Sequence, residues 1–163
     1  METLKSISEI QNWDKKNAFI WAHSNGGQIA LTTLEITGVT FPTVLWAPVS
    51  KPFPYSILYY TDEADDGGKS LRKYLAVFEQ TYNTDLYSLS RYINQIKAPV
   101  ELNQGTADTE VPVKWSEDLE KNLKEATVSA TLIEYPGADH NMRPAWNEVV
   151  QNNLKFFNDH VLR

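Results

Sequence analysis

Four short apolar runs recur along this chain of 163 residues, at 18–22, 43–47, 99–103 and 130–135. Runs of this length, bounded by prolines and glycines, are typical of strands buried on both faces of a sheet. Three stretches with helical spacing of apolar residues lie between or after them: 28–37, one opened by Pro112, and 146–157. Strands that alternate with helices predict an α/β fold, with a parallel sheet of about four strands and flanking helices.

The segment 51–97 interrupts this alternation. It begins with Pro52 and Pro54 and holds seven of the eight tyrosines, at 55, 59, 60, 74, 82, 87 and 92. Helical spacing around Tyr74 predicts a largely helical, cap-like insertion within a single domain spanning 1–163. Its tyrosines either line a substrate pocket or pack the insertion onto the sheet, and we favour the packing interpretation.

The first residues predict a short amphipathic helix over 4–12, because Leu4, Ile7 and Ile10 are spaced by three. The same stretch lacks the apolar core of a secretion signal. We therefore expect a cytoplasmic protein.

Composition excludes several classes of protein. Apolar residues make up 42% and charged residues 22% of the chain, with a net charge of −6, which indicates a globular chain. No apolar run approaches the roughly 20 residues of a membrane helix, and the basic residues are scattered, so neither membrane nor nucleic acid is an expected partner. The chain has no cysteine, which excludes disulfides, thiolate metal sites and a cysteine nucleophile. The three histidines show no i, i+4 pairing and the acidic run at 62–66 lacks EF-hand spacing, so we predict no metal and no cofactor.

The most informative turn is AHSNGG, residues 22–27, between the first run and the first helix. A strand, a sharp turn and a helix raise Ser24 to the apex, with small residues two positions before and after it. Such a turn strains the serine backbone, projects its hydroxyl, and points the Asn25 N–H at a developing oxyanion. The usual pattern is G-x-S-x-G, and Ala22 replaces the first glycine. The alternative is that Ser24 merely caps the helix.

Two further polar residues follow later strands. Asp108 lies in a turn after the third run, and His140 lies in a loop after the fourth. Each alone has a commoner role, Asp108 as a helix cap or turn residue and His140 as a surface histidine. Together with Ser24 they occur in the chain order Ser, Asp, His of the α/β-hydrolase triad, each after a separate strand. This order predicts a nucleophile, an orienting acid and a general base.

Three nearby candidates receive other roles. Asp139 adjoins His140 in sequence, whereas the acid of a triad normally arrives from a different strand end. His23 is expected to pack beneath the serine turn, and His160 to be solvated on the last helix.

Around these residues the sequence resembles the prolyl oligopeptidase and dienelactone hydrolase branch of the α/β-hydrolase superfamily. The segments that carry the resemblance are WAHSNGGQIAL, IKAPVELNQGTADTEVPVKWSEDL and IEYPGADHNM. The resemblance implies Ser24 as nucleophile, Asp108 as acid, His140 as base and the Asn25 N–H as one oxyanion donor. Because the nucleophile is a serine, it points towards the peptidase and esterase members.

The resemblance also has a departure. In the superfamily several strands precede the nucleophile, whereas here only about one helix precedes residue 18, so the chain resembles the carboxyl-terminal half of a hydrolase domain. A partial α/β-hydrolase fold leaves a sheet edge open at 18–22, and open strand edges pair with other chains. We therefore expect self-association, or completion by a missing amino-terminal half.

The leading hypothesis is a serine hydrolase that cleaves a small ester or a short peptide through an acyl-enzyme. The alternative is a catalytically impaired fragment that acts as an interaction module through its open edge.

Overall fold

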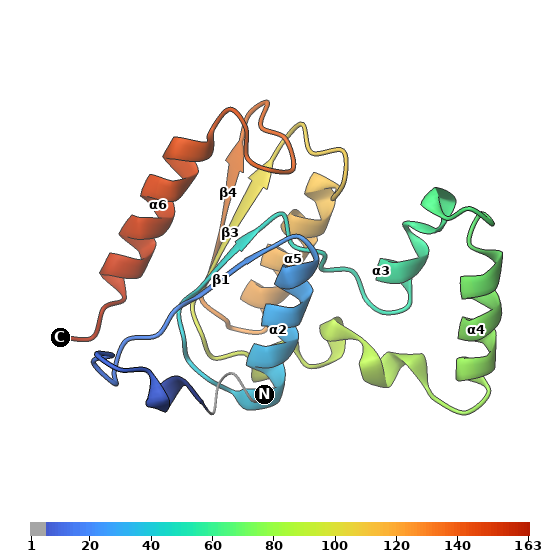
Figure 1. Ribbon diagram of the computed structural model, residues 1–163, viewed down its shortest axis with the longest axis horizontal. Helices are drawn as coiled ribbons and strands as arrows, with labels where there is room; N and C mark the ends of the chain where they lie inside the picture. The colour runs from blue at the N-terminus through green and yellow to red at the C-terminus, as the bar shows by residue number, and fades with distance from the viewer. Residues whose placement is uncertain (1–5) are drawn as a thin grey trace.

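The computed structural model describes residues 6–163. Its centre is one parallel sheet whose strands follow chain order: β1 (Ile20–His23), β2 (Thr43–Trp46), β3 (Val100–Gly105) and β4 (Ala130–Tyr135). Neighbouring strands pair from their first residues onward, so their carboxyl ends reach the same edge, at the top of Figure 1. The predicted α/β fold with a four-stranded parallel sheet is confirmed.

Helices cover both faces of this sheet (Figure 1). One face carries α2 (Asn25–Thr37) and α5 (Val113–Glu125), and the other carries α6 (Trp146–Asp159). Within residues 6–163, no helix combines the length and the apolar character needed to cross a bilayer.

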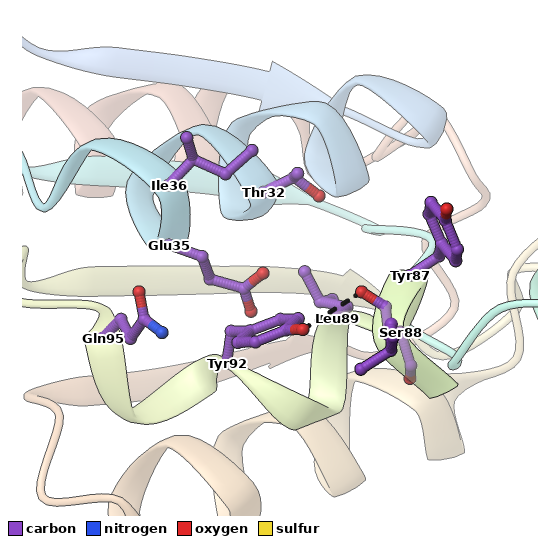
Figure 2. Close-up of a pocket in the computed structure, with 9 residues that line it drawn as sticks. Thr32, Glu35, Ile36, Tyr87, Ser88, Leu89, Tyr92 and Gln95 are labelled. Carbon is purple, nitrogen blue, oxygen red and sulfur yellow. Dashed lines mark hydrogen bonds between the residues drawn. The ribbon is translucent and has the colours of Figure 1, made fainter. Parts of the chain in front are cut away.

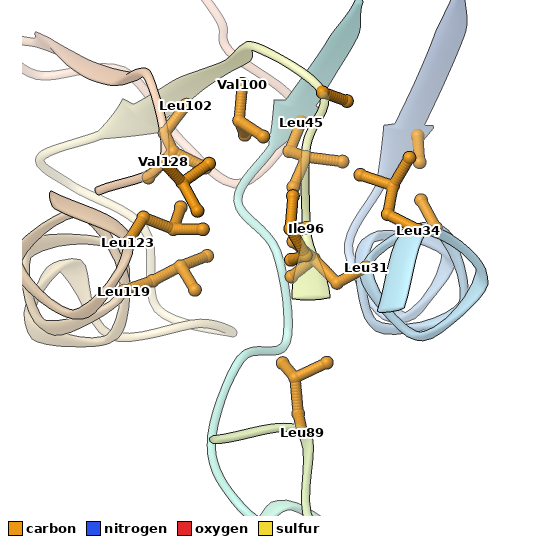
Figure 3. Packing of buried hydrophobic residues seen from close by; sticks show 13 residues of the cluster. Leu31, Leu34, Leu45, Leu89, Ile96, Val100, Leu102, Leu119, Leu123 and Val128 are labelled. Carbon is orange, nitrogen blue, oxygen red and sulfur yellow. The ribbon is translucent and has the colours of Figure 1, made fainter. Parts of the chain in front are cut away.

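Each face of the sheet has its own apolar core. Leu45 of β2 joins Leu31 of α2 and Leu123 of α5 in the first core (Figure 3). Val44, the preceding residue of β2, lies in the second core with Val149 of α6. Because successive side chains of a strand alternate between faces, a strand buried on both sides has to be apolar throughout.

The amino-terminal helix predicted over 4–12 is wrong for residues 10–12, and Leu4 lies outside the described residues. Among the described residues, Ser6 is helical, a single 3₁₀ turn, η1 (Ile7–Glu9), follows it, and the chain leaves the helical conformation at Ile10. Ile10 is extended and 57% exposed, so the apolar spacing has no surface to bury against. Without such packing a short helix does not extend further along the chain.

The segment between β2 and β3 is largely helical, as predicted. Its elements are α3 (Tyr55–Leu58), η2 (Thr61–Glu63), α4 (Lys69–Glu79), η3 (Thr84–Tyr87), η4 (Leu89–Arg91) and η5 (Ile93–Gln95). However, α4 buries none of its residues and stands away from the sheet (Figure 1). The favoured interpretation, that the insertion packs onto the sheet, is therefore wrong for α4.

The aromatic residues of the insertion instead contact one another. The ring centroids of Phe53 and Phe78 are 5.9 Å apart, and those of Phe78 and Tyr82 are 4.7 Å apart. A cavity of about 250 Å³ between α3 and α4 is lined by these phenylalanines with Ile57 and Leu75. Five tyrosines of the segment remain exposed: Tyr55, Tyr59, Tyr74, Tyr82 and Tyr87.

Candidate active site

Ser24 lies between β1 and α2 in a strained conformation, with φ 55° and ψ −123°. Its N–H donates to the Trp46 carbonyl at 2.8 Å, and its carbonyl accepts from the Val49 N–H at 3.0 Å. These bonds tie the turn to the end of β2, which holds a backbone conformation that a residue with a side chain rarely adopts. The Ser24 side chain makes no capping hydrogen bond. The alternative that Ser24 merely caps α2 is therefore wrong.

The turn requires small residues at three positions. A Cβ at Gly26 would lie 3.8 Å from the Ala22 Cβ, so larger side chains at these two flanking positions would meet each other. A Cβ at Gly27 would lie 2.6 Å from the Pro48 Cβ and 2.9 Å from its Cα, which is tighter than real Cβ contacts. Gly27 therefore allows α2 to approach the chain after β2. Only its place beside Gly26 in the sequence points to this need for a small residue.

Asp108 and His140 meet at the carboxyl ends of β3 and β4. His140 Nδ1 lies 2.9 Å from Asp108 Oδ2, and the two side chains are 15% and 0% exposed. Oδ2 also accepts from Gln104 Nε2 at 2.9 Å, and Oδ1 accepts from the N–H groups of Glu110 and Val111 at 2.8 and 2.9 Å. Four partners thus fix the orientation of the carboxylate. Gln104, on β3, is a second residue that sequence reasoning missed.

The acid loop and the histidine loop are joined through their backbones. The Ala107 N–H donates to the Ala138 carbonyl at 2.9 Å. A Cβ at Gly105 would overlap the Ala138 carbonyl oxygen and lie 2.5 Å from that of Asp139. Only glycine at the end of β3 lets these loops approach so closely.

His23 contacts the histidine loop. Its ring centroid lies 4.6 Å from that of His140, and its Nε2 lies 2.9 Å from the His140 carbonyl oxygen. His23 is half-buried, and these contacts are with the histidine loop rather than with the serine turn, so they bring the end of β1 against His140.

The other candidates have local roles. Asp139 Oδ1 accepts from the N–H groups of Asn141 and Arg143, so this carboxylate orders its own loop. His160 is half-buried rather than solvated, because its Nδ1 lies 2.8 Å from the Phe156 carbonyl at the end of α6. Among residues 6–163, no group of three or more histidine, aspartate and glutamate side chains is arranged to hold a metal ion.

Asp66, in the acidic run at 62–66, forms hydrogen bonds within its own turn. Its carboxylate accepts from the N–H groups of Gly68 and Ser70 at the start of α4. Hydrogen bonds from the Ser70 side chain and backbone hold the pKa of Asp66 below its usual value. This carboxylate is exposed and orders a turn.

One tyrosine of the insertion reaches the acid loop. The Tyr60 hydroxyl donates to the Glu110 carbonyl at 3.2 Å, and its ring lies 6.2 Å from that of Trp115. Burial, and secondarily the neighbouring Tyr59 and Asp108, raises the pKa of Tyr60 to about 12, so it remains a hydrogen-bond donor at neutral pH.

The structure brings Asp108 and His140 into direct contact, and Ser24 follows β1 at the same edge of the sheet. No hydrogen bond joins the Ser24 hydroxyl to His140 among the described residues. Within residues 6–163, His140 Nε2 has no hydrogen-bond partner either, whereas Nδ1 is held by Asp108. Asn25 is the first residue of α2, where a backbone N–H has no partner within the helix.

Comparison with known proteins agrees with this geometry. A model of the prolyl oligopeptidase family matches residues 1–162. Comparison with curated proteins gives no match.

Three solved structures show the same fold. A Mycobacterium tuberculosis puromycin-hydrolyzing peptidase is 21% identical over 85% of this chain and 21% of its own, with a TM-score of 0.64. A monoacylglycerol lipase from Paleococcus ferrophilus is 21% identical over 98% of this chain and 75% of its own, with a TM-score of 0.62. Est1E from Butyrivibrio proteoclasticus is 18% identical over 96% of this chain and 67% of its own, with a TM-score of 0.67.

The chain spans about a fifth of the length of the first of these proteins, 21%. The structural likeness shows that the fold is that of an α/β hydrolase, and the family model covers nearly every residue. The chain belongs to the prolyl oligopeptidase family.

Proposed function

We propose that this chain is a serine hydrolase that cleaves an ester or peptide bond through an acyl-enzyme, with Ser24, Asp108 and His140 as its triad. The observation that carries the proposal is the 2.9 Å contact between His140 Nδ1 and the buried Asp108 carboxylate, at the sheet edge where Ser24 is raised. Membership of a family of hydrolases supports the reaction class.

Each residue has one role in the reaction. Ser24 Oγ attacks the acyl carbonyl while His140 Nε2 takes its proton, and the imidazolium then protonates the leaving group. Asp108 accepts from Nδ1–H, which leaves Nε2 unprotonated and able to act as the base. Water then attacks the acyl-enzyme by the same steps, with His140 again as base.

The Asn25 N–H is the proposed oxyanion donor. It lies at the start of α2, where the helix dipole also favours negative charge. The family resemblance assigns a second donor to a loop before the nucleophile strand, which corresponds to no segment of this chain. Because loss of one donor costs about 10²–10³ in turnover, we expect a chain extended at its amino end to be faster.

The proposal covers two kinds of scissile bond, an ester and a peptide bond. The structural neighbours include a peptidase and a lipase, and both chemistries use the same triad. A panel of small acyl esters and aminoacyl-arylamides, run with this chain and with an amino-terminally extended one, would separate the two.

The first prediction is that a fluorophosphonate probe labels this protein covalently at Ser24. The strained turn projects the hydroxyl, and no capping bond occupies it. Labelling is measured by mass spectrometry of the intact and digested protein, and Ser24→Ala should abolish it. Ser50→Ala is the matched control, because the Ser50 hydroxyl already donates to the Trp115 carbonyl. A folded protein that resists the probe, or labels elsewhere, contradicts the proposal.

A second candidate function, an interaction module, is favoured by the open edge of the sheet. β1 has no partner on its outer side among the described residues, and Trp21 on it is 51% exposed. An apolar strand with one open edge is a template for pairing with another strand. We propose that a second copy of this chain, or an amino-terminal half of the hydrolase domain, pairs there.

We expect this chain to self-associate in light scattering at high concentration, and Trp21→Lys to shift it towards the monomer. A charged edge residue opposes strand pairing. Trp146→Lys is the matched control, because Trp146 is 49% exposed but lies on α6. A wild-type chain that stays monomeric, or equal effects of both variants, would argue against pairing through β1.

A further inference from the structure

A cavity of about 330 Å³ lies between α2 and the segment from η3 to η5 (Figure 2). Ile36 of α2 and Leu89 of η4 give it apolar walls, and Tyr87 and Tyr92 add aromatic rings. Pockets of this size hold small organic ligands. The cavity is distinct from the proposed triad, because Glu35, which also lines it, follows Ser24 by 11 residues on α2, a rise of about 16 Å.

Glu35 is the unexplained residue of this cavity. It is 4% exposed, and its Oε1 is buried with no hydrogen-bond partner. In Figure 2 its carboxyl group points from α2 towards Tyr92. An unpaired buried carboxyl costs stability, because water no longer solvates it and nothing replaces the water.

No residue of the cavity wall compensates Glu35. It is the only charged side chain that lines the cavity, and Tyr87 and Tyr92 are the other titratable groups there. The Tyr92 hydroxyl donates to the Leu86 carbonyl rather than to the carboxyl. Arg91 of η4 is exposed and does not line the cavity.

The other elements packed against α2 bring no counter-charge either. The titratable residue of β1 is His23, which lies against His140 at the far end of α2, and η5 has none. Burial alone raises the pKa of Glu35 to about 8.

We propose that this cavity binds a small amine with an apolar body, whose ammonium group pairs with Glu35. An ammonium supplies the donors and the positive charge that the carboxylate lacks. The aromatic rings of Tyr87 and Tyr92 line the cavity and can contact a cation, and Ile36 and Leu89 suit the apolar body. The proposal is independent of hydrolase activity.

Forming the ion pair releases a proton wherever Glu35 is protonated beforehand. The ligand enters as an ammonium ion, and a protonated Glu35 releases its proton to solvent as the ion pair forms. Binding therefore competes with protonation of Glu35. Below a pH of about 8, affinity for the amine should rise with pH, by about tenfold between pH 6 and pH 7.

The test is an NMR titration of the whole chain with phenethylamine, and with 2-phenylethanol as its neutral isostere. Phenethylamine should shift the amides around the cavity, those of Thr32, Ile36 and Leu89 among them, with an affinity that rises about tenfold between pH 6 and pH 7. The alcohol should bind more weakly at pH 7 and without this pH dependence.

Two variants separate the ion pair from general apolar binding. Glu35→Gln should weaken amine binding at pH 8 by about tenfold or more and remove its pH dependence, because the charge-assisted bond is lost. Thr32→Phe keeps the carboxyl but fills the cavity, and should abolish binding of both probes. Equal affinities for amine and alcohol, an unchanged pH dependence in Glu35→Gln, or undiminished binding in Thr32→Phe would each overturn the proposal.

Discussion

Replacing Asp108 with asparagine is expected to slow the reaction of Ser24 with a fluorophosphonate by about 10⁴-fold, the factor by which the equivalent change lowers the turnover of a well-studied serine protease. The reason lies in the four donors around the carboxylate, from His140, Gln104, Glu110 and Val111. Each carboxylate oxygen accepts two of these hydrogen bonds. In either orientation of the asparagine amide, its NH₂ group therefore replaces an acceptor and faces two donors.

If the NH₂ faces His140, the imidazole becomes the acceptor at Nδ1 and carries its proton on Nε2, where it cannot take the serine proton. The rate of labelling gives the size of the effect. The ¹⁵N shifts of the His140 ring report the tautomer independently of any reaction, and they should change in Asp108→Asn.

Asp139→Asn is the matched control for Asp108→Asn. Asp139 is the adjacent carboxylate, but its Oδ1 accepts from backbone N–H groups of its own loop, and an amide oxygen can do the same. We expect its labelling rate to stay within a few-fold of wild type. Similar rates for both variants would show that Asp108 does not orient the base.

The sequence predicts the sheet and the polar residues at its edge because both depend on local patterns. Strands covered on both faces are apolar throughout, as Val44 and Leu45 are, on opposite faces of β2. Parallel strands bring their carboxyl ends to one edge, so residues after separate strands converge, as Asp108 and His140 do.

The sequence does not predict which residues that lie far apart along the chain contact each other. The apolar stripe of α4 predicts a helix, but nothing local says that Phe78 meets Phe53 rather than the sheet. Likewise, Gly27 is needed because of Pro48, which lies across the turn on another strand end. The burial of Glu35, in contrast, is indicated by its spacing. Glu35 follows Leu31 by four residues and therefore shares the buried face of α2.

Glu35 leads to the second prediction, a loss of stability on the alkaline side that one substitution removes. Burial raises the pKa of Glu35 from about 4.5 in the unfolded chain to about 8 in the folded one. The folded state therefore holds a proton that the unfolded state has already released. The stabilisation is complete below a pH of about 4.5 and is lost as the pH rises through about 8.

In this window the free energy of unfolding should fall by up to about 1.4 kcal/mol per pH unit, on the order of 5 kcal/mol in all. Glu35→Gln carries no ionisable group, so its stability should exceed that of wild type by a few kcal/mol at pH 9, and by much less at pH 5. Urea unfolding at the two pH values measures this difference. Glu101 is a second buried carboxyl whose pKa burial raises, but it is present in both proteins and cancels in the comparison. Parallel pH profiles for wild type and variant would mean that Glu35 finds a partner or solvent in the folded protein, and the cavity would then hold no unpaired carboxyl.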